Sequence, residues 1–220
     1  MNVISEKSLY KTVTNAELFL FEGGSLSLPE KIQLANWILG HQNREKKFIF
    51  YPTTADRDAG VRLFSGEKIK AKFLADNTVE LETLRLLALL RPEMPEVQQL
   101  FWEANQRLFP ICFANGCTVG ECRHASIAVM RYLTASDFSG SADRLERTLG
   151  ILKQHRDGDG KWKAFPFYFT LLWLTELPND FARDELAYTR PHCEKLLTKG
   201  LQDDDPGTPL RRKILQRVIA

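Results

Sequence analysis

Residues 149–177 constrain the fold more than any other part of this sequence. They start in the last part of a predicted helix and continue as K-Q-H-R-D-G-D-G-K-W. The nearly all-apolar stretch A-F-P-F-Y-F-T-L-L-W-L-T-E-L then follows. Asp and Gly supply turn conformations, and Pro166 suits the first turn of a helix. The segment therefore predicts a helix ending at Gln154, a turn anchored by Trp162, and a second helix that is apolar all round and buried. This is one αα-hairpin.

Weaker copies of this hairpin pattern occur earlier in the chain. Two further predicted helices end near a glutamine, Gln42 and Gln106, and each is followed by phenylalanines in its connection. The helices after these connections read L-E-T-L-R-L-L-A-L-L and A-S-I-A-V-M-R-Y-L. Repetition of a helix pair along a chain is typical of stacked helical repeats. We therefore expect an all-α fold of stacked αα-hairpins in one domain covering residues 1–220.

The third hairpin carries a more specific pattern. Gln154, the turn Asp159-Gly160-Lys161-Trp162 and the inner helix from Pro166 resemble the repeat of squalene cyclases and protein prenyltransferases. This resemblance implies an α/α toroid, in which inner helices line an apolar cavity and the connections emerge at one end. A full ring needs more hairpins than 220 residues can supply. The resemblance therefore implies a partial toroid, and pairing as a homodimer would cover its open edge.

The catalytic motifs of these families have no counterpart in the sequence. It contains no D-x-D-D, no D-x-C and no D-D-x-x-D motif, which cyclases, prenyltransferases and terpene synthases use for protonation, zinc binding and ionisation. The aspartates at 203–205 are followed by Pro and Gly, so the later aspartate of the ionising motif is missing. Likeness of fold does not transfer activity. The resemblance therefore leaves open whether the protein is an enzyme.

Composition indicates the setting in which the protein works. The net charge of +2 gives no strong attraction to nucleic acid or to a membrane surface. The longest apolar run, 165–174, is too short to cross a bilayer, and the first residues lack the apolar core of a signal peptide. We therefore expect a cytoplasmic protein without a membrane span. Four cysteines in 220 residues do not form the disulfide framework of a small secreted domain.

Caps and prolines predict further helix boundaries. Asn77, with Glu80 three residues later, resembles a capping pair and predicts a helix start. Pro92 predicts the end of that helix, and the Arg190-Pro191 step predicts a break in a helix that begins near Asn179. Other helices are expected over residues 6–21, from Pro29, from Pro95, over 121–133, from Ser141 and from Pro209.

Residues 44–76 are the least regular part of the sequence. Phe48, Phe50 and Tyr51 alternate with other residues as in a short strand. Ser65-Gly66 suits the turn of a small β-hairpin. A connection of this length in a compact domain is usually functional or has structure of its own.

Charged residues in this connection predict a binding surface. If the hairpins stack, the connection lies at the same end as residues 116–121 and 157–162, and the three segments form one mouth. The ligand-binding residues expected to face this mouth are Arg62, Glu121, His124 and Tyr168. The alternative is a solvated loop whose surface ion pairs each contribute little.

The segment C-F-A-N-G-C-T-V-G-E-C-R-H is a candidate metal site. Thiolates and a neutral imidazole are good zinc ligands, so the predicted ligands are Cys112, Cys117, Cys122 and His124. The spacing is not that of a C-x-x-C knuckle, and Cys122 and His124 point about 200° apart on a regular helix. One alternative is three partly buried thiols and a histidine at the start of a helix, without a metal. The other is a nucleophile, Cys117 or Cys122, with His124 as its base.

Two functional classes remain open. The first is a non-catalytic helical-repeat protein that binds a protein partner or a ligand at its loop face, and the missing acid motifs favour it. The second is a terpenoid or prenyl-type enzyme, or an isoprenoid-binding protein, whose apolar cavity takes a hydrophobic small molecule and whose activity depends on zinc. The aromatic residues that would line this cavity are Phe165, Phe167, Tyr168, Phe169 and Trp173. Core packing is the more common reason for such an aromatic helix.

Overall fold

The computed structural model describes residues 3–136, 138–163, 165–201 and 205–220, apart from the side chain of residue 179. These residues form ten α-helices and one short 3-10 helix, and none of them forms a β-strand. The prediction of an all-α fold is confirmed. Within the same residues, no helix combines the length and the apolar character needed to cross a bilayer.

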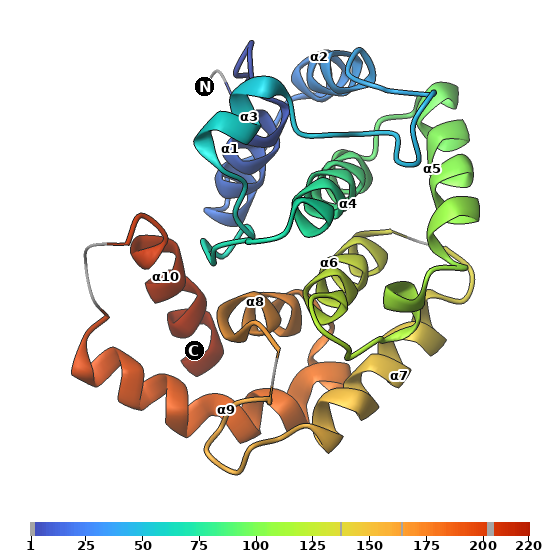
Figure 1. Ribbon diagram of the computed structural model, residues 1–220. Helices are drawn as coiled ribbons and strands as arrows, with labels where there is room; N and C mark the ends of the chain where they lie inside the picture. Colours follow the sequence, from blue (N-terminus) through green and yellow to red (C-terminus); the bar gives the residue numbers. More distant parts are fainter. Residues whose placement is uncertain (1–2, 137, 164, 202–204) are drawn as a thin grey trace. The chain divides into compact units, whose positions relative to one another are not determined.

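The chain divides into two compact units, whose helices are labelled in Figure 1. The first unit contains residues 1–61 and 69–111. The second contains residues 62–68 and 112–220. The short segment 62–68 therefore belongs to the second unit, although it lies in the N-terminal half of the sequence.

The first unit is built around one long helix, α4. α4 packs against α1 and α2, and α3 packs against α1. The helices of this unit are α1 (Leu9–Phe21), α2 (Leu28–Leu39), α3 (Thr54–Ala59), α4 (Lys72–Leu90) and α5 (Pro95–Leu108).

Capping boxes begin two of these helices. Glu30 and Ser27 cap each other's backbone at the start of α2, and Asp56 and Thr53 do the same at the start of α3. Asp56 is buried and also accepts a hydrogen bond from the Ser8 hydroxyl, which ties α3 to the start of α1. α3 was not expected from the sequence, although its Thr-x-x-Asp pattern is the same kind of signal.

The prediction of a helix start at Asn77 is wrong. α4 already begins at Lys72, and the Asn77 side-chain N–H donates to the carbonyl oxygen of Phe73 (2.6 Å), one turn earlier in the same helix. Every residue from 76 to 88 is buried. A helix buried on all sides is fixed by its neighbours, so a local capping pattern does not set where it starts.

No strand forms at residues 48–51, contrary to the alternation of the sequence. The N–H groups of Ile49 and Phe50 instead donate to one carboxylate oxygen of Glu80, at 3.1 and 2.6 Å. Backbone N–H groups used by a buried acid are not free for a strand partner. Burial raises the pKa of Glu80 to about 7, and the two N–H bonds and the charge of Arg107 oppose this rise.

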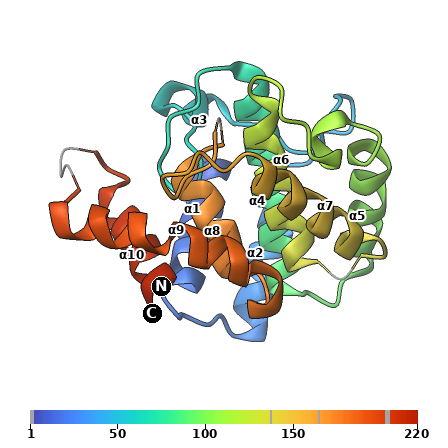
Figure 2. The ribbon, with the colours of Figure 1, turned by 90° about the horizontal axis from the view of Figure 1, so that it is seen from below.

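The second unit is built around α8. α8 packs against α6, α9 and α10, and Figure 1 shows it between α6 and α10, with Figure 2 giving the view from below. Residues 169–174 of α8 are all buried, as its apolar sequence predicts. The helices of this unit are η1 (Cys112–Asn115, the 3-10 helix), α6 (Cys122–Ala135), α7 (Ser141–Gln154), α8 (Phe167–Glu176), α9 (Asn179–Lys199) and α10 (Thr208–Ile219).

Segment 62–68 contains the predicted turn at Ser65-Gly66. The Gly66 N–H donates to the Leu63 carbonyl oxygen (2.7 Å), and Gly66 has a φ of 85°, which favours glycine. Arg62 and Lys68 form a single antiparallel bridge on either side of the turn. The turn is thus confirmed, whereas the flanking residues form one bridge instead of a two-stranded hairpin.

Glu67 fixes this segment to the start of α8. Its carboxylate oxygens accept N–H bonds from Tyr168 (3.3 Å) and Phe169 (3.0 Å), two groups that a helix start leaves without helical partners. The guanidinium of Arg131, from α6, lies 5.2 Å from the ring of Phe64 and 5.1 Å from that of Phe169. A carboxylate and an aromatic pair therefore hold segment 62–68 within the second unit.

α9 continues through Pro191, so the predicted break at Arg190-Pro191 is wrong. Proline removes one helical N–H donor and disfavours a helix interior. Residues on both sides of it are held by the rest of the unit. The Thr189 hydroxyl donates to the carbonyl oxygen of Gly160 (2.7 Å), and Cys193 is fully buried. These tertiary contacts outweigh the local preference.

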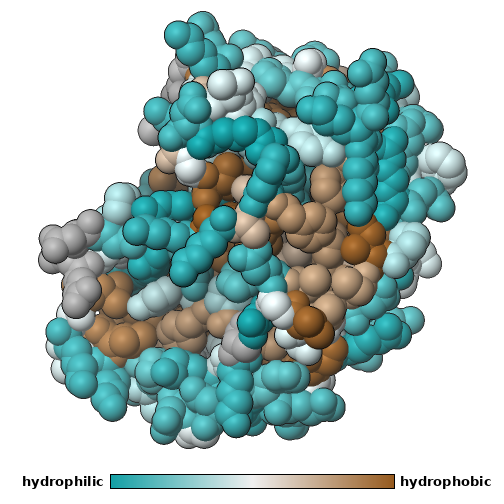
Figure 3. Space-filling view, viewed as in Figure 1, coloured by the Kyte–Doolittle hydropathy of each residue, from teal (hydrophilic) through white to brown (hydrophobic). Residues whose placement is uncertain are grey.

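The surface mixes polar and apolar residues. On the face seen in Figure 3, hydrophobic residues appear among hydrophilic ones. Large apolar side chains that reach solvent include Leu28, Trp102 and Val119. Single exposed apolar side chains are normal for soluble proteins. Val119 is of interest because it lies in the loop that contains the candidate site.

Candidate metal centre

The structure brings three cysteines of the second unit together. The Sγ atoms of Cys112, Cys117 and Cys122 all lie within 4.8 Å of one another. The Sγ atoms of Cys112 and Cys122 are 3.9 Å apart. Among the described residues, this is the one group of three or more histidine, cysteine, aspartate or glutamate side chains close enough to share a metal ion.

Two short elements and the loop between them position these thiols. Cys112 begins η1, Cys122 begins α6, and Cys117 lies in the loop. Gly116 follows η1 with a φ of 77°, and a Cβ atom there would lie 2.5 Å from the Ile151 side chain, so this turn favours glycine. The Ser126 hydroxyl donates to the Cys117 carbonyl oxygen (3.0 Å) and fixes the loop to α6.

The sulfur geometry suits a tetrahedral zinc ion. A Zn–S distance of about 2.3 Å places two sulfurs of a tetrahedron about 3.8 Å apart. The 3.9 Å between Cys112 and Cys122 matches this spacing, and Cys117 is within reach of both. Cys112 is exposed and the other two are partly exposed, so an ion can enter from solvent. The three thiols therefore supply three ligands at the surface and leave a fourth position open.

The Cys122 thiol is protonated before an ion binds. Burial first, and then the neighbouring thiols of Cys112 and Cys117, raise the pKa of Cys122 to about 11. Since the thiolate is the metal ligand, binding must release protons. The positive charge of a bound cation would stabilise the thiolate form.

His124 does not join the three thiols. It lies in the first turn of α6, two residues after Cys122, where a regular helix turns side chains about 200° apart. Its Nδ1 atom is buried and has no hydrogen-bond partner among the described residues. Burial, followed by the charge of Arg123, lowers the pKa of His124. The structure thus brings together three of the four predicted metal ligands and leaves a neutral imidazole outside them.

Glu121 precedes Cys122 at the N-cap position of α6, and its side chain makes no capping hydrogen bond. It is partly exposed, and its carboxylate is not part of the thiol group. Of the four predicted ligand-binding residues, Glu121 and His124 therefore flank Cys122 along the chain without joining the cluster.

Arg62 and Tyr168 are held elsewhere in the unit, by Asp205 and Arg211. Arg62 donates to the Gly66 carbonyl oxygen (2.9 Å) and pairs with Asp205 (3.4 Å). Arg211 pairs with the same carboxylate (3.6 Å), and its guanidinium lies 5.1 Å from the ring centre of Tyr168. Burial raises the pKa of the Tyr168 hydroxyl.

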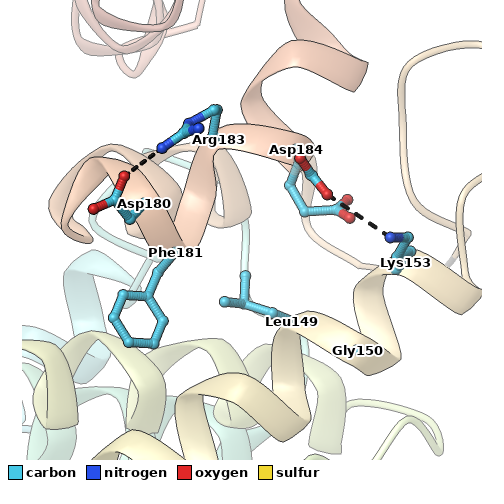
Figure 4. A pocket seen from close by; sticks show the side chains of 8 residues that line it. Leu149, Gly150, Lys153, Asp180, Phe181, Arg183 and Asp184 are labelled. Carbon is cyan, nitrogen blue, oxygen red and sulfur yellow. Dashed lines mark hydrogen bonds and ion pairs between the residues drawn. The ribbon is translucent and has the colours of Figure 1, made fainter.

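A groove between α7 and α9 was not expected from the sequence. Its volume is about 250 Å³. In Figure 4 the side chain of Leu149 points toward Phe181, and dashed lines join Arg183 to Asp180 and Lys153 to Asp184. A ligand there would compete with these ion pairs. The residues that line the groove are Leu149, Gly150, Lys153, Asp180, Phe181, Arg183, Asp184 and Glu185.

The cysteine cluster combines soft ligands, suitable sulfur spacing and access from solvent, which the groove and the Arg62–Tyr168 group do not. It is the candidate functional site of this protein. Comparisons with protein-family models, with curated proteins and with solved structures found no match for this chain.

Proposed function

We propose that this protein is a non-catalytic helical protein that binds one zinc ion through the thiolates of Cys112, Cys117 and Cys122. The observation that carries the proposal is the mutual distance of the three Sγ atoms, all within 4.8 Å. These atoms come from a 3-10 helix, a loop and an α-helix, so a bound ion would link three separate pieces of backbone. Such a link would stabilise the loop at residues 112–122.

Ligand chemistry favours zinc over the hard cations. Three sulfur ligands and no carboxylate make a soft site, which magnesium and calcium do not favour because they take oxygen ligands. Zinc has no redox chemistry and accepts a tetrahedral set of three thiolates and one water molecule. A water ligand suits the exposed side of the cluster, where Cys112 lies.

The burial of the α8 side chains favours a binding protein over an enzyme with an isoprenoid cavity. Phe169, Leu172 and Trp173 are fully buried. Side chains that fill a core in this way leave no apolar space for a ligand where they pack. Four features stay predictions: a protein partner at the loop face, the cytoplasmic location, the homodimer and the partial α/α toroid.

A metal titration tests the proposal. Reduced, metal-free protein is titrated with Co²⁺ and with Zn²⁺, and thiolate-to-cobalt absorption and zinc content per chain are measured. We expect one ion per chain. Cys117→Ser and Cys112→Ser each remove a ligand and should weaken affinity by about 100-fold or more, since even loss of an outer partner costs about 10- to 100-fold.

Cys193→Ser is the matched control, because Cys193 lies buried on α9 and its thiol contacts the hydroxyl of Thr189 (3.7 Å). It should bind zinc as the wild type does. Circular dichroism establishes that each variant is folded. Absence of thiolate-to-cobalt absorption in the wild type, or equal zinc affinity in Cys117→Ser and Cys193→Ser, would contradict the proposal.

A further inference from the structure

We infer that Cys112 and Cys122 are a thiol-disulfide switch: a small-molecule disulfide such as oxidised glutathione converts them into an intramolecular disulfide, which a thiol reductant reverses. The exclusion of zinc by this disulfide rests on the proposed function. Formation of the disulfide does not.

The distance between the two sulfurs supports this pairing. Their 3.9 Å separation must shorten to about 2.05 Å in a disulfide. Rotation of the two side chains can supply this change, because Cys112 is exposed and Cys122 is partly exposed. The connection from η1 to α6 also contains Gly116 and Gly120, both with positive φ.

Exposure determines which thiol reacts first. Cys112 is exposed, whereas Cys122 is partly covered. The Cys112 thiolate attacks one sulfur of oxidised glutathione, forms a mixed disulfide and releases one glutathione thiolate. Cys122, beside it, then attacks the Cys112 Sγ and releases the second. Two protein thiols lose their protons and are oxidised together by two electrons, and one molecule of oxidised glutathione is reduced to two of glutathione.

Disulfide formation removes two of the three proposed zinc ligands. Cys117 alone remains as a thiol, and one thiolate does not hold zinc at a protein surface. Oxidised protein should therefore release its ion, and reduction should restore binding. Bound zinc, conversely, should protect the same thiols from oxidation.

The test follows free thiols in metal-free protein equilibrated in glutathione redox buffers. The three cysteines fall in one tryptic peptide, because the sequence has no Lys or Arg between Arg107 and Arg123. Free thiols are therefore labelled with one alkylating reagent and, after reduction, the released thiols with a second. We expect the second label on Cys112 and Cys122, with two of the four thiols still free.

Variants separate this inference from the proposed function. Cys117→Ser should form the disulfide as readily as the wild type while losing zinc, and Cys193→Ser should do both as the wild type does. Cys112→Ser and Cys122→Ser should keep all their thiols in the buffer that oxidises the wild type. A crosslink that contains Cys117, or no crosslink in Cys117→Ser, overturns the pairing.

Zinc binding is measured on the same preparations. If the wild type binds zinc but Cys117→Ser forms no disulfide, the switch fails and the proposed function stands. If the wild type forms the Cys112–Cys122 disulfide but binds no zinc, the proposed function fails and the disulfide stands. Zinc that stays bound to fully oxidised protein overturns the mutual exclusion.

Discussion

The indole N–H of Trp162 donates a 2.7 Å hydrogen bond to a carboxylate oxygen of Glu185, which lies on α9. The same carboxylate accepts two further bonds from the guanidinium of Arg156, at 2.7 and 3.3 Å. Glu185 is almost fully buried. One side chain of α9 therefore holds both ends of the turn that follows α7, since Arg156 and Trp162 are also paired by a backbone bridge.

Glu185→Ala should lower the free energy of unfolding by about 2–4 kcal/mol, because it leaves the indole N–H and the Arg156 guanidinium without their buried acceptor. Urea unfolding measures the change. Glu194→Ala is the control on the same helix, because Glu194 forms an exposed pair with Arg190. It should change stability by less than about 0.5 kcal/mol. Equal effects of the two substitutions would contradict the role given to Glu185.

The turn itself was predicted from the sequence, but its partners were not. Asp157 behaves as a turn aspartate, since one of its oxygens accepts N–H bonds from Asp159 (2.8 Å) and Lys161 (3.0 Å). The Tyr188 hydroxyl also donates to this oxygen (3.1 Å). Tyr188 and Glu185 come from a later helix, and no local pattern links them to the turn. Asp and Gly residues next to each other indicate a turn. The residues that anchor the turn are set by tertiary packing.

Two glycines of this turn should respond differently to alanine. Gly158 and Gly160 both have positive φ, at 94° and 84°, so alanine strains the backbone by about 1–2 kcal/mol at either. A Cβ at Gly158 would meet no atom within 4 Å, whereas one at Gly160 would lie 2.7 Å from the His192 Cβ. Gly160→Ala should therefore cost about 1–3 kcal/mol more than Gly158→Ala. Thermal unfolding of the two variants measures the difference, and equal losses would argue against this close approach.

Glu80 should make the first unit less stable as pH rises. Its pKa is raised to about 7 in the folded protein, against about 4.3 in an unfolded chain, so the folded state holds the extra proton between these values. This contribution is fully present below about pH 4.3 and is lost as pH rises through about 7. Across this range it changes the free energy of unfolding by about 4 kcal/mol.

Glu80→Gln tests this contribution, because glutamine keeps an oxygen that can accept the N–H bonds of Ile49 and Phe50 and does not titrate. We expect the variant to gain stability relative to wild type as pH rises from about 4.5 to 8. Glu45→Gln, at an exposed position, is the control and should follow the wild type. A constant difference between Glu80→Gln and wild type across this range would show that Glu80 does not titrate there.

The cysteine cluster shows how far spacing alone can predict a site. The sequence identified Cys112, Cys117 and Cys122 as soft ligands close along the chain, and the structure brings their thiols together. It also grouped His124 with them, although helix geometry turns that side chain away. The signal that brings the thiols together lies in the backbone. Gly116, with a φ of 77°, allows the turn between η1 and the loop, where any other residue would be strained.

At Asn77 and Pro191, strong local signals gave wrong predictions of helix boundaries. The signals are a capping pattern at Asn77 and a missing N–H donor at Pro191, yet α4 and α9 continue through these residues. α4 is buried on all sides around Asn77, and α9 is held on both sides of Pro191 by Thr189 and Cys193. Local preferences of a few kcal/mol or less yield to tertiary burial of this extent.

Gly150 lies inside α7 and lines the groove between α7 and α9. A Cβ atom added to it would meet no atom within 4 Å. Alanine fits this space and favours the helix, so Gly150→Ala should raise the free energy of unfolding by about 0.5–1 kcal/mol. Gly140→Ala is the matched control, because Gly140 precedes the same helix in equally open space but has a φ of 80°. It should instead lower stability by about 1–2 kcal/mol. Urea unfolding of both variants measures the two signs, and a loss of stability in Gly150→Ala would mean that the space beside Gly150 is filled in the folded protein.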